Sequence, residues 1–399
     1  MVSAVFKERC LTRVAFPLIG SINLPGSGVY NYLVNLMRVL AEHAKDRIQP
    51  VLFAGTDVPT ANVEPFVAIS GVEVVQAADF DDEKRGQRLR DALMTGCDHA
   101  AAQSLQKHRI DVLFESAQYC GWRFPFPTIA WFPDFQHRHL REMFSFGAYW
   151  KRDLGFRAQV LSRRHIMLSS EDSRRDCERF FPQSIGRTSV VHFAVLPPDA
   201  SDFEGIRRIV ANYKLPEHFF YLPNQFWKHK NHQTVIEALH ILKQQGFDLV
   251  VAASGKPEDY RHPEHYKALQ SLVVSLGLKH NFRFLGIVPR EHVFALMRSC
   301  TAMINPSLSE GWSSTVEEAK SLGVPMLLSD LSVHLEQAGD SALFFDRHKA
   351  EQLAALMSQH KHLSVSSRLE MEQLAFAVSR NRLSQFAKDF LYTVERTLA

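Results

Sequence analysis

The chain has 399 residues, of which 46% are hydrophobic and 22% charged, and its formal net charge is +3. This length is large for one α/β domain and sufficient for two cores, and the small net charge gives no support for nucleic-acid binding. Charged residues interrupt every long apolar stretch, so we expect neither a signal peptide nor a membrane span. Five scattered cysteines without a C-x-x-C pair favour neither disulfides nor a metal site, and we expect a cytoplasmic protein.

The first half of the chain alternates short β-branched or aromatic runs with segments of helical periodicity. This alternation is typical of stacked βαβ units and predicts a parallel sheet covered by helices. The expected strands span residues 13–18, 49–54, 72–76, 111–115, 128–132, 166–169 and 189–193.

A glycine-rich turn follows the first expected strand, where Gly20, Gly26 and Gly28 lead into a helix. Such turns bring backbone N–H groups close to a phosphate or a sugar. Alone, the pattern is a weak indication of a ligand site.

Residues 138–175 combine basic and aromatic side chains. Nine Lys or Arg residues are interleaved there with aromatic residues such as Phe146 and Trp150. A helical surface of this composition can lie on an anionic membrane or hold an anionic acceptor. A solvated helix face is the alternative.

Residues 196–216 contain four Pro or Gly residues around a charged middle, which predicts a linker between two domains. A second series of strands follows, each succeeded by a helical pattern. These strands are expected at residues 219–222, 249–253, 282–285, 302–305, 326–329 and 342–345.

The predicted fold class is therefore α/β, with two Rossmann-like, doubly wound parallel-sheet domains. After Asp346 the pattern is helical, and the last helix carries an apolar face. We expect a first domain over residues 1–200, a second over 201–375, and a C-terminal helix over 376–399 that packs back on the first. The apolar face of that helix contains Phe386, Phe390, Leu391 and Val394.

The stretch Asn305 to Pro325 is the most informative part of the sequence. It leaves a strand at Asn305, forms a loop through Glu310, and enters a helix near Ser314. Ser314 and Glu317 have the S-x-x-E spacing of a capping box. A helix start beside a glycine is suited to a phosphate, because unpaired N–H groups lie there.

Two further carboxylates bracket this helix start. Glu310 in the loop can accept hydrogen bonds from sugar hydroxyls, and Glu318 within the helix can accept them from both hydroxyls of a ribose. The helix dipole alone also favours glutamate near a helix N-terminus, so the spacing is not decisive.

The Glu310-x7-Glu318 arrangement, set after Asn-Pro-Ser and before Gly323-x-Pro325, resembles the E-x7-E motif of retaining glycosyltransferases of family 4, the glycosyl transferases group 1. The resemblance implies the two-lobed GT-B fold. It also implies transfer of a sugar from a UDP- or GDP-sugar to a glycan, lipid-linked or small-molecule acceptor, as in polysaccharide biosynthesis.

The resemblance assigns roles to most of the candidate residues. Glu310 and the backbone that follows it would hold the donor sugar, the helix start would meet the diphosphate, and Glu318 would bind the ribose. The residues implied in these three roles are Glu310, Gly311, Trp312 and Ser313, then Ser314 and Thr315, and finally Glu318.

The loop after the first strand of the second domain departs from the family pattern. Lys230 matches the family's phosphate-binding lysine, but Asn224 and Gln225 stand where an arginine is common. We expect Lys228 to supply the missing charge and Asn224 to line the donor site.

Other matches are weaker. Gly26 and Gly28 correspond to the family's first-domain glycine loop, and Gly255, Gly286 and Ile287 would lie near the nucleotide. The histidine that family members often carry after a first-domain strand is replaced by Pro133, so His137 or His139 is expected to take its place. Main-chain contacts of this kind do not choose between uracil and guanine.

The resemblance implies reaction with retention of configuration, in which the leaving phosphate takes the acceptor proton. Glu310, Lys230 and His137 are the expected catalytic residues. Positive charge from Lys230 and the helix start can stabilise the leaving group, so we expect no metal and no other cofactor. Two alternatives remain, a catalytically weak nucleotide-sugar binding protein and a sugar-nucleotide 2-epimerase.

Overall fold

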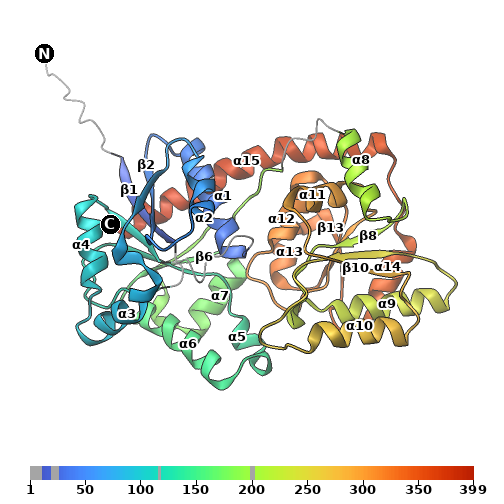
Figure 1. Cartoon of the computed structure of the whole chain (residues 1–399), viewed down its shortest axis with the longest axis horizontal. Helices are drawn as coiled ribbons and strands as arrows, with labels where there is room; N and C mark the ends of the chain where they lie inside the picture. The colour runs from blue at the N-terminus through green and yellow to red at the C-terminus, as the bar shows by residue number, and fades with distance from the viewer. Residues whose placement is uncertain (1–10, 19–26, 116–117, 198–202) are drawn as a thin grey trace, which may run out of the picture. The chain divides into compact units, whose positions relative to one another are not determined.

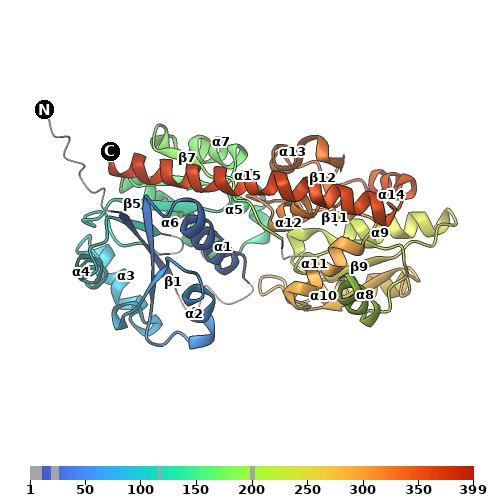
Figure 2. The ribbon, with the colours of Figure 1, turned by 90° about the horizontal axis from the view of Figure 1, so that it is seen from above.

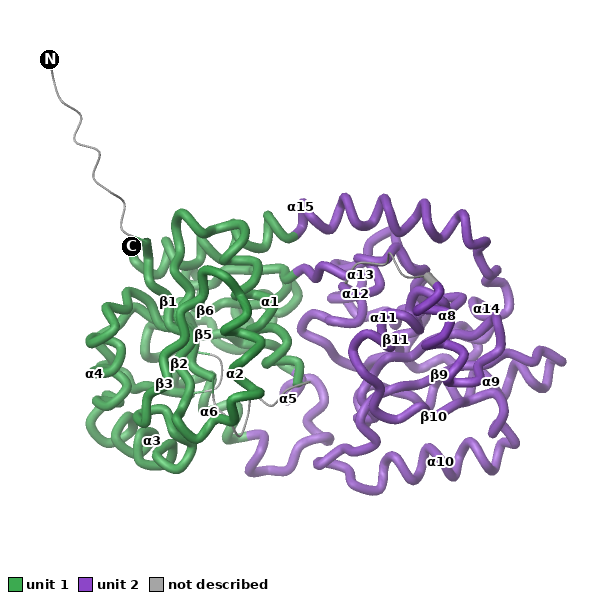
Figure 3. The backbone as a smooth tube through the Cα atoms, turned by 45° about the horizontal axis from the view of Figure 1, so that its top comes forward, with its two compact units in different colours: residues 1–135, 150–193, 383–399 green, residues 136–149, 194–382 purple. Residues whose placement is uncertain are grey.

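The computed structural model describes residues 11–18, 27–115, 118–197 and 203–399. The chain divides into two compact units (Figure 3). Unit 1 contains Met1–Phe135, Trp150–Phe193 and Leu383–Ala399, and unit 2 contains Gln136–Tyr149 and Ala194–Arg382.

Within the described residues, unit 1 has a seven-stranded parallel sheet in the order β3-β2-β1-β4-β5-β6-β7. Chain order reverses between β1 and β4, as in doubly wound folds. The strands are β1 (Thr12–Leu18), β2 (Ile48–Ala54), β3 (Glu73–Gln76), β4 (Val112–Glu115), β5 (Thr128–Phe132), β6 (His165–Leu168) and β7 (Thr188–Val190).

Unit 2 has a parallel sheet with the corresponding order β10-β9-β8-β11-β12-β13, six strands in the part of the chain that is described. Here the reversal lies between β8 and β11. The strands are β8 (Phe220–Leu222), β9 (Val251–Ser254), β10 (Phe282–Gly286), β11 (Met303–Asn305), β12 (Met326–Ser329) and β13 (Ala342–Phe345).

Helices connect the strands of both sheets (Figure 1). They are α1 (Gly28–His43), α2 (Thr60–Val67), α3 (Arg85–Met94), α4 (His99–Lys107), α5 (Gln136–His139), α6 (Phe146–Leu161), α7 (Glu171–Phe180), α8 (Phe203–Asn212), α9 (His232–Gln244), α10 (His265–Ser275), α11 (Arg290–Ser299), α12 (Ser314–Leu322), α13 (Ser332–Ala338), α14 (Ala350–Gln359) and α15 (Val365–Leu398).

The core of unit 2 explains why its sequence alternates as it does. Strands such as β12 are buried along their whole length, because helices cover both faces of a parallel sheet. Helix α9 buries Val235, Ile236, Leu239 and Leu242 on one face at helical spacing. Together with α10 and α14, this face covers one side of β8, β9, β10 and β11.

Helix α15 is the longest helix of the described residues (Figure 2). Its end packs in unit 1, where Phe390 lies 5.9 Å from the rings of Phe16 and Phe114 and Phe386 lies 6.1 Å from that of Tyr32 on α1. The expected return of the C-terminal helix to the first sheet is thereby confirmed. The helix begins at Val365, however, eleven residues before the expected start.

The segment predicted as a linker contains a helix. Helix α8 occupies its middle and packs on α11, where the Tyr213 hydroxyl lies 2.6 Å from His292 Nδ1. The prediction gave too much weight to the prolines at the ends of the segment, which bound the helix without interrupting it.

Candidate active site

The candidate residues of unit 2 gather at the carboxyl ends of β8, β9, β10 and β11, where the order of the sheet reverses. Asn224 lies two residues after β8, and Asn305 ends β11. Both side chains are buried, and Asn224 Nδ2 donates to Asn305 Oδ1 at 3.2 Å. The amide pair therefore joins the two loops that carry most of the predicted site.

Two further hydrogen bonds hold the loop after β8 against the loop after β11. The N–H of Leu308 donates to the carbonyl of His229 at 2.8 Å, and Asn231 Nδ2 donates to the carbonyl of Pro306 at 3.1 Å. Asn231 adopts a left-handed conformation (φ 54°), which asparagine tolerates better than most residues. As a result, Lys230 projects toward the loop of Glu310.

Lys230 and Glu310 form the central ion pair of the site. Lys230 Nζ lies 2.5 Å from Glu310 Oε1, and the two side chains are 15% and 10% exposed. Such a charge-assisted hydrogen bond is strong where water is largely excluded. Two residues that the sequence assigned to donor phosphate and donor sugar are thus adjacent.

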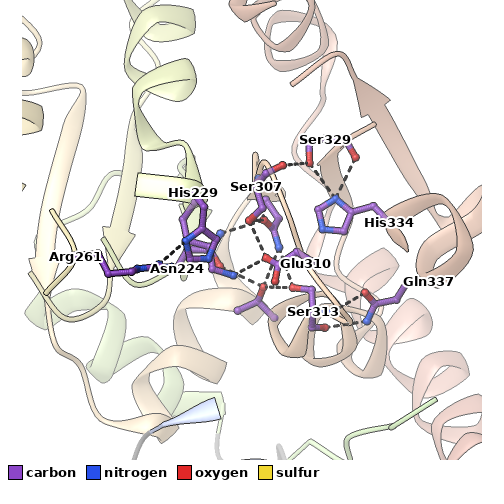
Figure 4. A network of polar contacts seen from close by, with 12 residues as sticks. Asn224, His229, Arg261, Ser307, Glu310, Ser313, Ser329, His334 and Gln337 are labelled. Carbon is purple, nitrogen blue, oxygen red and sulfur yellow. Dashed lines mark hydrogen bonds and ion pairs between the residues drawn. The ribbon is translucent and has the colours of Figure 1, made fainter. Parts of the chain in front are cut away.

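Ser307 adds a second contact to this pair (Figure 4). Its hydroxyl lies 2.7 Å from Glu310 Oε1 and also 2.7 Å from Asn305 Oδ1. One hydroxyl proton serves one of these acceptors at a time, so the serine can donate to either. The sequence analysis did not single out Ser307, whose only signal is its place after a strand.

The start of α12 is bonded differently from the expectation. The Ser314–Glu317 capping box was wrong: Ser313 is the N-cap residue and no side-chain cap hydrogen bond forms. Glu317 is instead held by Arg382 (2.7 Å) and Gln337 (3.0 Å). A charged partner outcompetes the single backbone N–H that a capping box would offer.

The Ser313 hydroxyl makes no hydrogen bond to a backbone N–H of the first turn of α12. Asn305 Nδ2 donates to Ser313 Oγ at 2.9 Å, and Thr315 Oγ1 lies 3.1 Å from the same oxygen. The first-turn N–H groups of a helix have no intrahelical acceptor. Ser313 does not cap them, and the contact with a diphosphate expected at Ser314 and Thr315 stays a prediction.

Glu318 lies on the same helix, with its side chain mostly buried and 3.5 Å from Arg290 of α11. Burial raises the pKa of its carboxyl, and the Arg290 charge opposes this shift. Arg290 follows Gly286 and Ile287 closely in the sequence, and the nucleotide contacts expected for these two residues stay predictions. Ile287 itself is exposed.

Gly255 follows β9 directly and lies against the loop after β8. Its N–H donates to the carbonyl of Gly286 at 2.8 Å. Its φ of +152° disfavours any other residue, and a Cβ at this position would lie 2.5 Å from the carbonyl oxygen of Asn224. The glycine therefore allows the loops after β8 and β9 to approach each other.

Lys228, expected to replace a missing arginine, has an exposed side chain, and its backbone N–H donates to Asp259 Oδ2 at 3.0 Å. Arg261, which the sequence analysis missed, lies beside it. Arg261 donates to Gln136 Oε1 (3.0 Å) and lies 3.1 Å from His229 Nδ1. No local pattern marked this arginine, because Gln136 and His229 are distant from it in sequence.

Asp259 is the anchor of these contacts. Burial would raise the pKa of its carboxyl, but hydrogen bonds from the N–H groups of Lys228 and Arg261, with the Arg261 charge, outweigh burial and lower it. The ionised carboxylate therefore holds the Lys228 backbone.

His137 belongs to unit 2 and is completely buried in α5, whereas His139 is exposed. The His137 ring lies 5.6 Å from that of Tyr149 and 6.4 Å from that of Phe144. The structure thus packs His137 among aromatic rings of its own segment. Its role at the sugar stays a prediction.

In unit 1, Gly28 begins α1, and Ser27 caps that helix by accepting from the N–H of Tyr30 at 3.3 Å. Gly26 lies outside the described residues, as does Gly20. The prediction for this glycine loop is therefore carried by Gly28 alone.

The basic segment 138–175 is less basic than its composition suggests. At least five of its nine cations form ion pairs with carboxylates in the described structure, and Arg164 is buried. The pairs are Arg152–Asp134, Arg157–Asp153, Arg164–Glu115, Arg174–Glu171 and Arg175–Asp172. Helix α6 also exposes large apolar side chains, namely Phe146, Trp150, Leu154 and Leu161.

The described residues contain neither a membrane-spanning helix nor a group of metal ligands. Among these residues no helix combines the length and apolarity needed to cross a membrane. Likewise, no three His, Cys, Asp or Glu side chains of the described chain are grouped as metal ligands.

Sequence comparisons relate the second half of the chain to known proteins. The family model Glycosyl transferases group 1 matches residues 202–375. The serotype-specific mannosyltransferase WbdA of Escherichia coli is 27% identical over 172 residues, 42% of this chain and 20% of WbdA. The O-antigen chain mannosyltransferase RfbU of Salmonella typhimurium is 24% identical over 181 residues, 45% of this chain and 46% of RfbU. The matches thus span less than half of either relative.

Solved structures match over nearly the whole chain. A glycosyltransferase from Rickettsia africae aligns with 98% of this chain and 99% of its own, with a TM-score of 0.70 at 14% identity. Anabaena Alr3699/HepE, solved in complex with UDP and glucose, aligns with 96% and 99%, with a TM-score of 0.65 at 16% identity. Identities this low show the fold alone, and they confirm the expected GT-B architecture.

Proposed function

We propose that the chain, whose residues 202–375 match the glycosyl transferases group 1 family, is a retaining glycosyltransferase that uses a nucleoside diphosphate sugar without a metal ion. The observation that carries the proposal is the Lys230–Glu310 pair beside the uncapped start of α12. A cation, a hydroxyl-binding carboxylate and free N–H groups are the three elements that a diphosphate-linked sugar requires.

Each element has a separate task in this proposal. The first turn of α12 and Lys230 bind the diphosphate and stabilise the charge that develops on it. Glu310 accepts hydrogen bonds from the donor sugar, and Glu318 accepts them from the ribose. The Lys230–Glu310 pair then also sets the distance between phosphate and sugar subsites.

In the transfer step, the acceptor hydroxyl oxygen bonds to the anomeric carbon on the face from which the phosphate departs. The bond between that carbon and the phosphate oxygen breaks, and the leaving phosphate takes the hydroxyl proton. The chain needs no protein base for this step, which fits a site whose central carboxylate is already bonded to Lys230. His137 is proposed to contact the sugar.

The identity of the sugar rests on the relatives. WbdA and RfbU are both named as mannosyltransferases, so we place a mannosyl donor first, with a growing glycan or a lipid-linked saccharide as acceptor. A glucosyl donor comes next, since HepE was solved with UDP and glucose.

Calorimetric titration of the purified chain with UDP, GDP and ADP, without divalent metal, tests the proposal and identifies the nucleotide. Tight binding of one of them is expected, followed by transfer from the corresponding sugar donor. Binding without transfer to any acceptor favours the binding-protein alternative. Donor that is converted to its 2-epimer without an acceptor indicates the epimerase.

We also propose that α6 contacts an anionic membrane that carries a lipid-linked acceptor. Phe146, Trp150, Leu154 and Leu161 are exposed on one side of this helix, and the exposed cations Lys151 and Arg163 flank them. Sedimentation with vesicles of phosphatidylcholine, with and without phosphatidylglycerol, tests this contact. Trp150→Ser with Leu154→Ser should abolish binding to the anionic vesicles, and unchanged binding would contradict it.

A further inference from the structure

A buried glutamine on α13 holds the backbone of the candidate donor loop. Gln337 Nε2 donates to the carbonyl of Ser313 at 2.8 Å, and Gln337 Oε1 accepts from the N–H of Ser313 at 3.1 Å. The side chain is 3% exposed. Both bonds go to the main chain, so Gln337 determines the direction of the backbone between Glu310 and the first turn of α12 (Figure 4).

Gln337 is in turn held by a buried carboxylate. Its Nε2 also donates to Glu317 Oε1 at 3.0 Å, and the Glu317 side chain is 2% exposed. A carboxylate at this depth requires paired charges, because desolvation of a single ion is costly. Glu317 therefore needs cationic side chains within hydrogen-bonding distance of its carboxylate.

Two cations reach Glu317. Arg382 of α15 donates to Oε2 at 2.7 Å, and Lys320 Nζ lies 3.3 Å from Oε1 and also donates to the carbonyl of Gln337. Burial lowers the pKa of the Lys320 ammonium, and the neighbouring Glu317 carboxylate opposes that shift. The Glu317 carboxylate thus has a partner on each of its two oxygens.

These contacts form a continuous path from the C-terminal helix to the donor loop. Arg382 is the last residue of unit 2, and α15 continues from it into unit 1. The path runs from Arg382 through Glu317 and Gln337 to Ser313, whose hydroxyl then meets Asn305. Every member of the path lies within unit 2.

Resting on the proposed function, we propose that Arg382, Glu317 and Gln337 are positioning residues that align the Glu310–Ser313 loop with the start of α12 for transfer. They act through the Ser313 backbone and not by touching the substrate. Loss of these contacts should misplace the donor sugar relative to the diphosphate. The nucleotide contacts should stay in place, because Glu318 and Gly286 are not members of the path.

The test compares three substitutions in the full chain. Gln337→Met keeps the side-chain length and removes both bonds to Ser313, and Arg382→Met removes the cation from Glu317. Each should lower kcat by tenfold or more, which is about the effect of one lost bond worth 1.4 kcal/mol. The dissociation constant for the nucleoside diphosphate should change less than about twofold, and Arg382→Lys should recover most of kcat.

Glu372→Gln is the matched control. Glu372 ties α15 to Arg298 at 2.7 Å in the same unit but has no bond to the path. The control should therefore keep wild-type kcat. Equal losses in the control and in Arg382→Met, or wild-type kcat in Gln337→Met, would overturn the proposal.

Amide hydrogen exchange separates this proposal from the proposed function. Without any ligand, Gln337→Met should speed exchange in peptides that contain Ser313, while Glu372→Gln should not. Unchanged exchange there would overturn the positioning role even if the chain proves to be a transferase. Faster exchange in a chain that transfers no sugar would contradict the proposed function alone.

Discussion

Lys230 Nζ lies 2.5 Å from Glu310 Oε1, although 80 positions separate the two residues in the sequence. Their adjacency follows from the sheet order, because β8 and β11 are neighbours and each loop starts at the same edge. The charge of each side chain is paired with that of the other. A donor must therefore share these two groups, and binding should depend on both.

Lys230→Met should lower kcat/KM by about 10²- to 10³-fold, because it removes the buried cation nearest the proposed leaving group. Steady-state kinetics with the identified donor measure the effect. Lys228→Met is the control: its exposed side chain should contribute less than about tenfold. Equal effects of the two substitutions would show that Lys230 has no special place in the site.

The double variant Lys230→Met, Glu310→Gln separates stability from function. Lys230→Met alone leaves a buried carboxylate without its cation, which should cost about 1–3 kcal/mol of unfolding free energy. Glu310→Gln should restore much of that stability, since the amide needs no cation. Denaturant unfolding measures both variants. Transfer activity should stay low in the double variant, and recovery of activity with stability would argue against a direct role.

The strands were predictable because their signal is local. Every expected strand lies within a few residues of an observed one, since strands buried on both faces appear as short apolar runs. The clearest error, at β7, has the same cause. The prediction ran to residue 193 but β7 ends at Val190; Val191 is buried, and its N–H still donates to the carbonyl of Leu168 in β6 at 2.8 Å.

The candidate site was only partly predictable. Residues that follow strands, such as Lys230 and Glu310, could be found because each marks a strand end. Gln337, Arg382 and Arg261 could not be found in this way. Ser313 and Glu317 lie 24 and 20 positions from Gln337, Glu317 lies 65 positions from Arg382, and His229 lies 32 positions from Arg261. Long-range side-chain partners are decided by packing and not by periodicity.

Gly255→Ala should destabilise the protein by about 3 kcal/mol. Its backbone lies at a φ that alanine avoids, and the new Cβ would meet the Asn224 carbonyl oxygen at 2.5 Å. Gly286→Ala is the control, because its φ of +69° is strained but the Cβ would meet no atom within 4 Å, so it should cost about 1 kcal/mol. Thermal or denaturant unfolding distinguishes them, and equal costs would mean that the close approach to Asn224 is not rigid.

His334→Asn should weaken the acid sensitivity of folding. His334 is completely buried, and its Nδ1 lies 3.0 Å from the carbonyl oxygen of Ser329. A carbonyl only accepts, so Nδ1 carries the proton. Burial lowers the His334 pKa to about 4, against 6.5 in the unfolded chain, although the nearby Glu310 carboxylate opposes the shift.

The sign of this effect follows from proton uptake. Between pH 6.5 and about 4 the unfolded chain binds the extra proton, so the free energy of unfolding falls as the pH is lowered through this window. Between pH 7 and pH 5, His334 should account for about 2 kcal/mol of that fall. Urea unfolding at both pH values should show this difference between wild type and His334→Asn. Replacement of the exposed His348 is the control, and identical pH dependence in His334→Asn would refute the argument.

Removal of divalent metal should leave transfer unaffected. The charge that develops on a leaving diphosphate needs a positive partner, and Lys230 with the first turn of α12 can provide one without a cation bridge. Initial rates after dialysis against EDTA should therefore equal those with added Mg²⁺, at the same donor concentration.

The same comparison in Lys230→Met is more informative, because a cation added in solution could then replace the lost ammonium. We expect Mg²⁺ to have no effect on the wild type and to raise the rate of this variant. A wild-type rate that disappears with EDTA and returns with Mg²⁺ would instead assign the diphosphate charge to a metal.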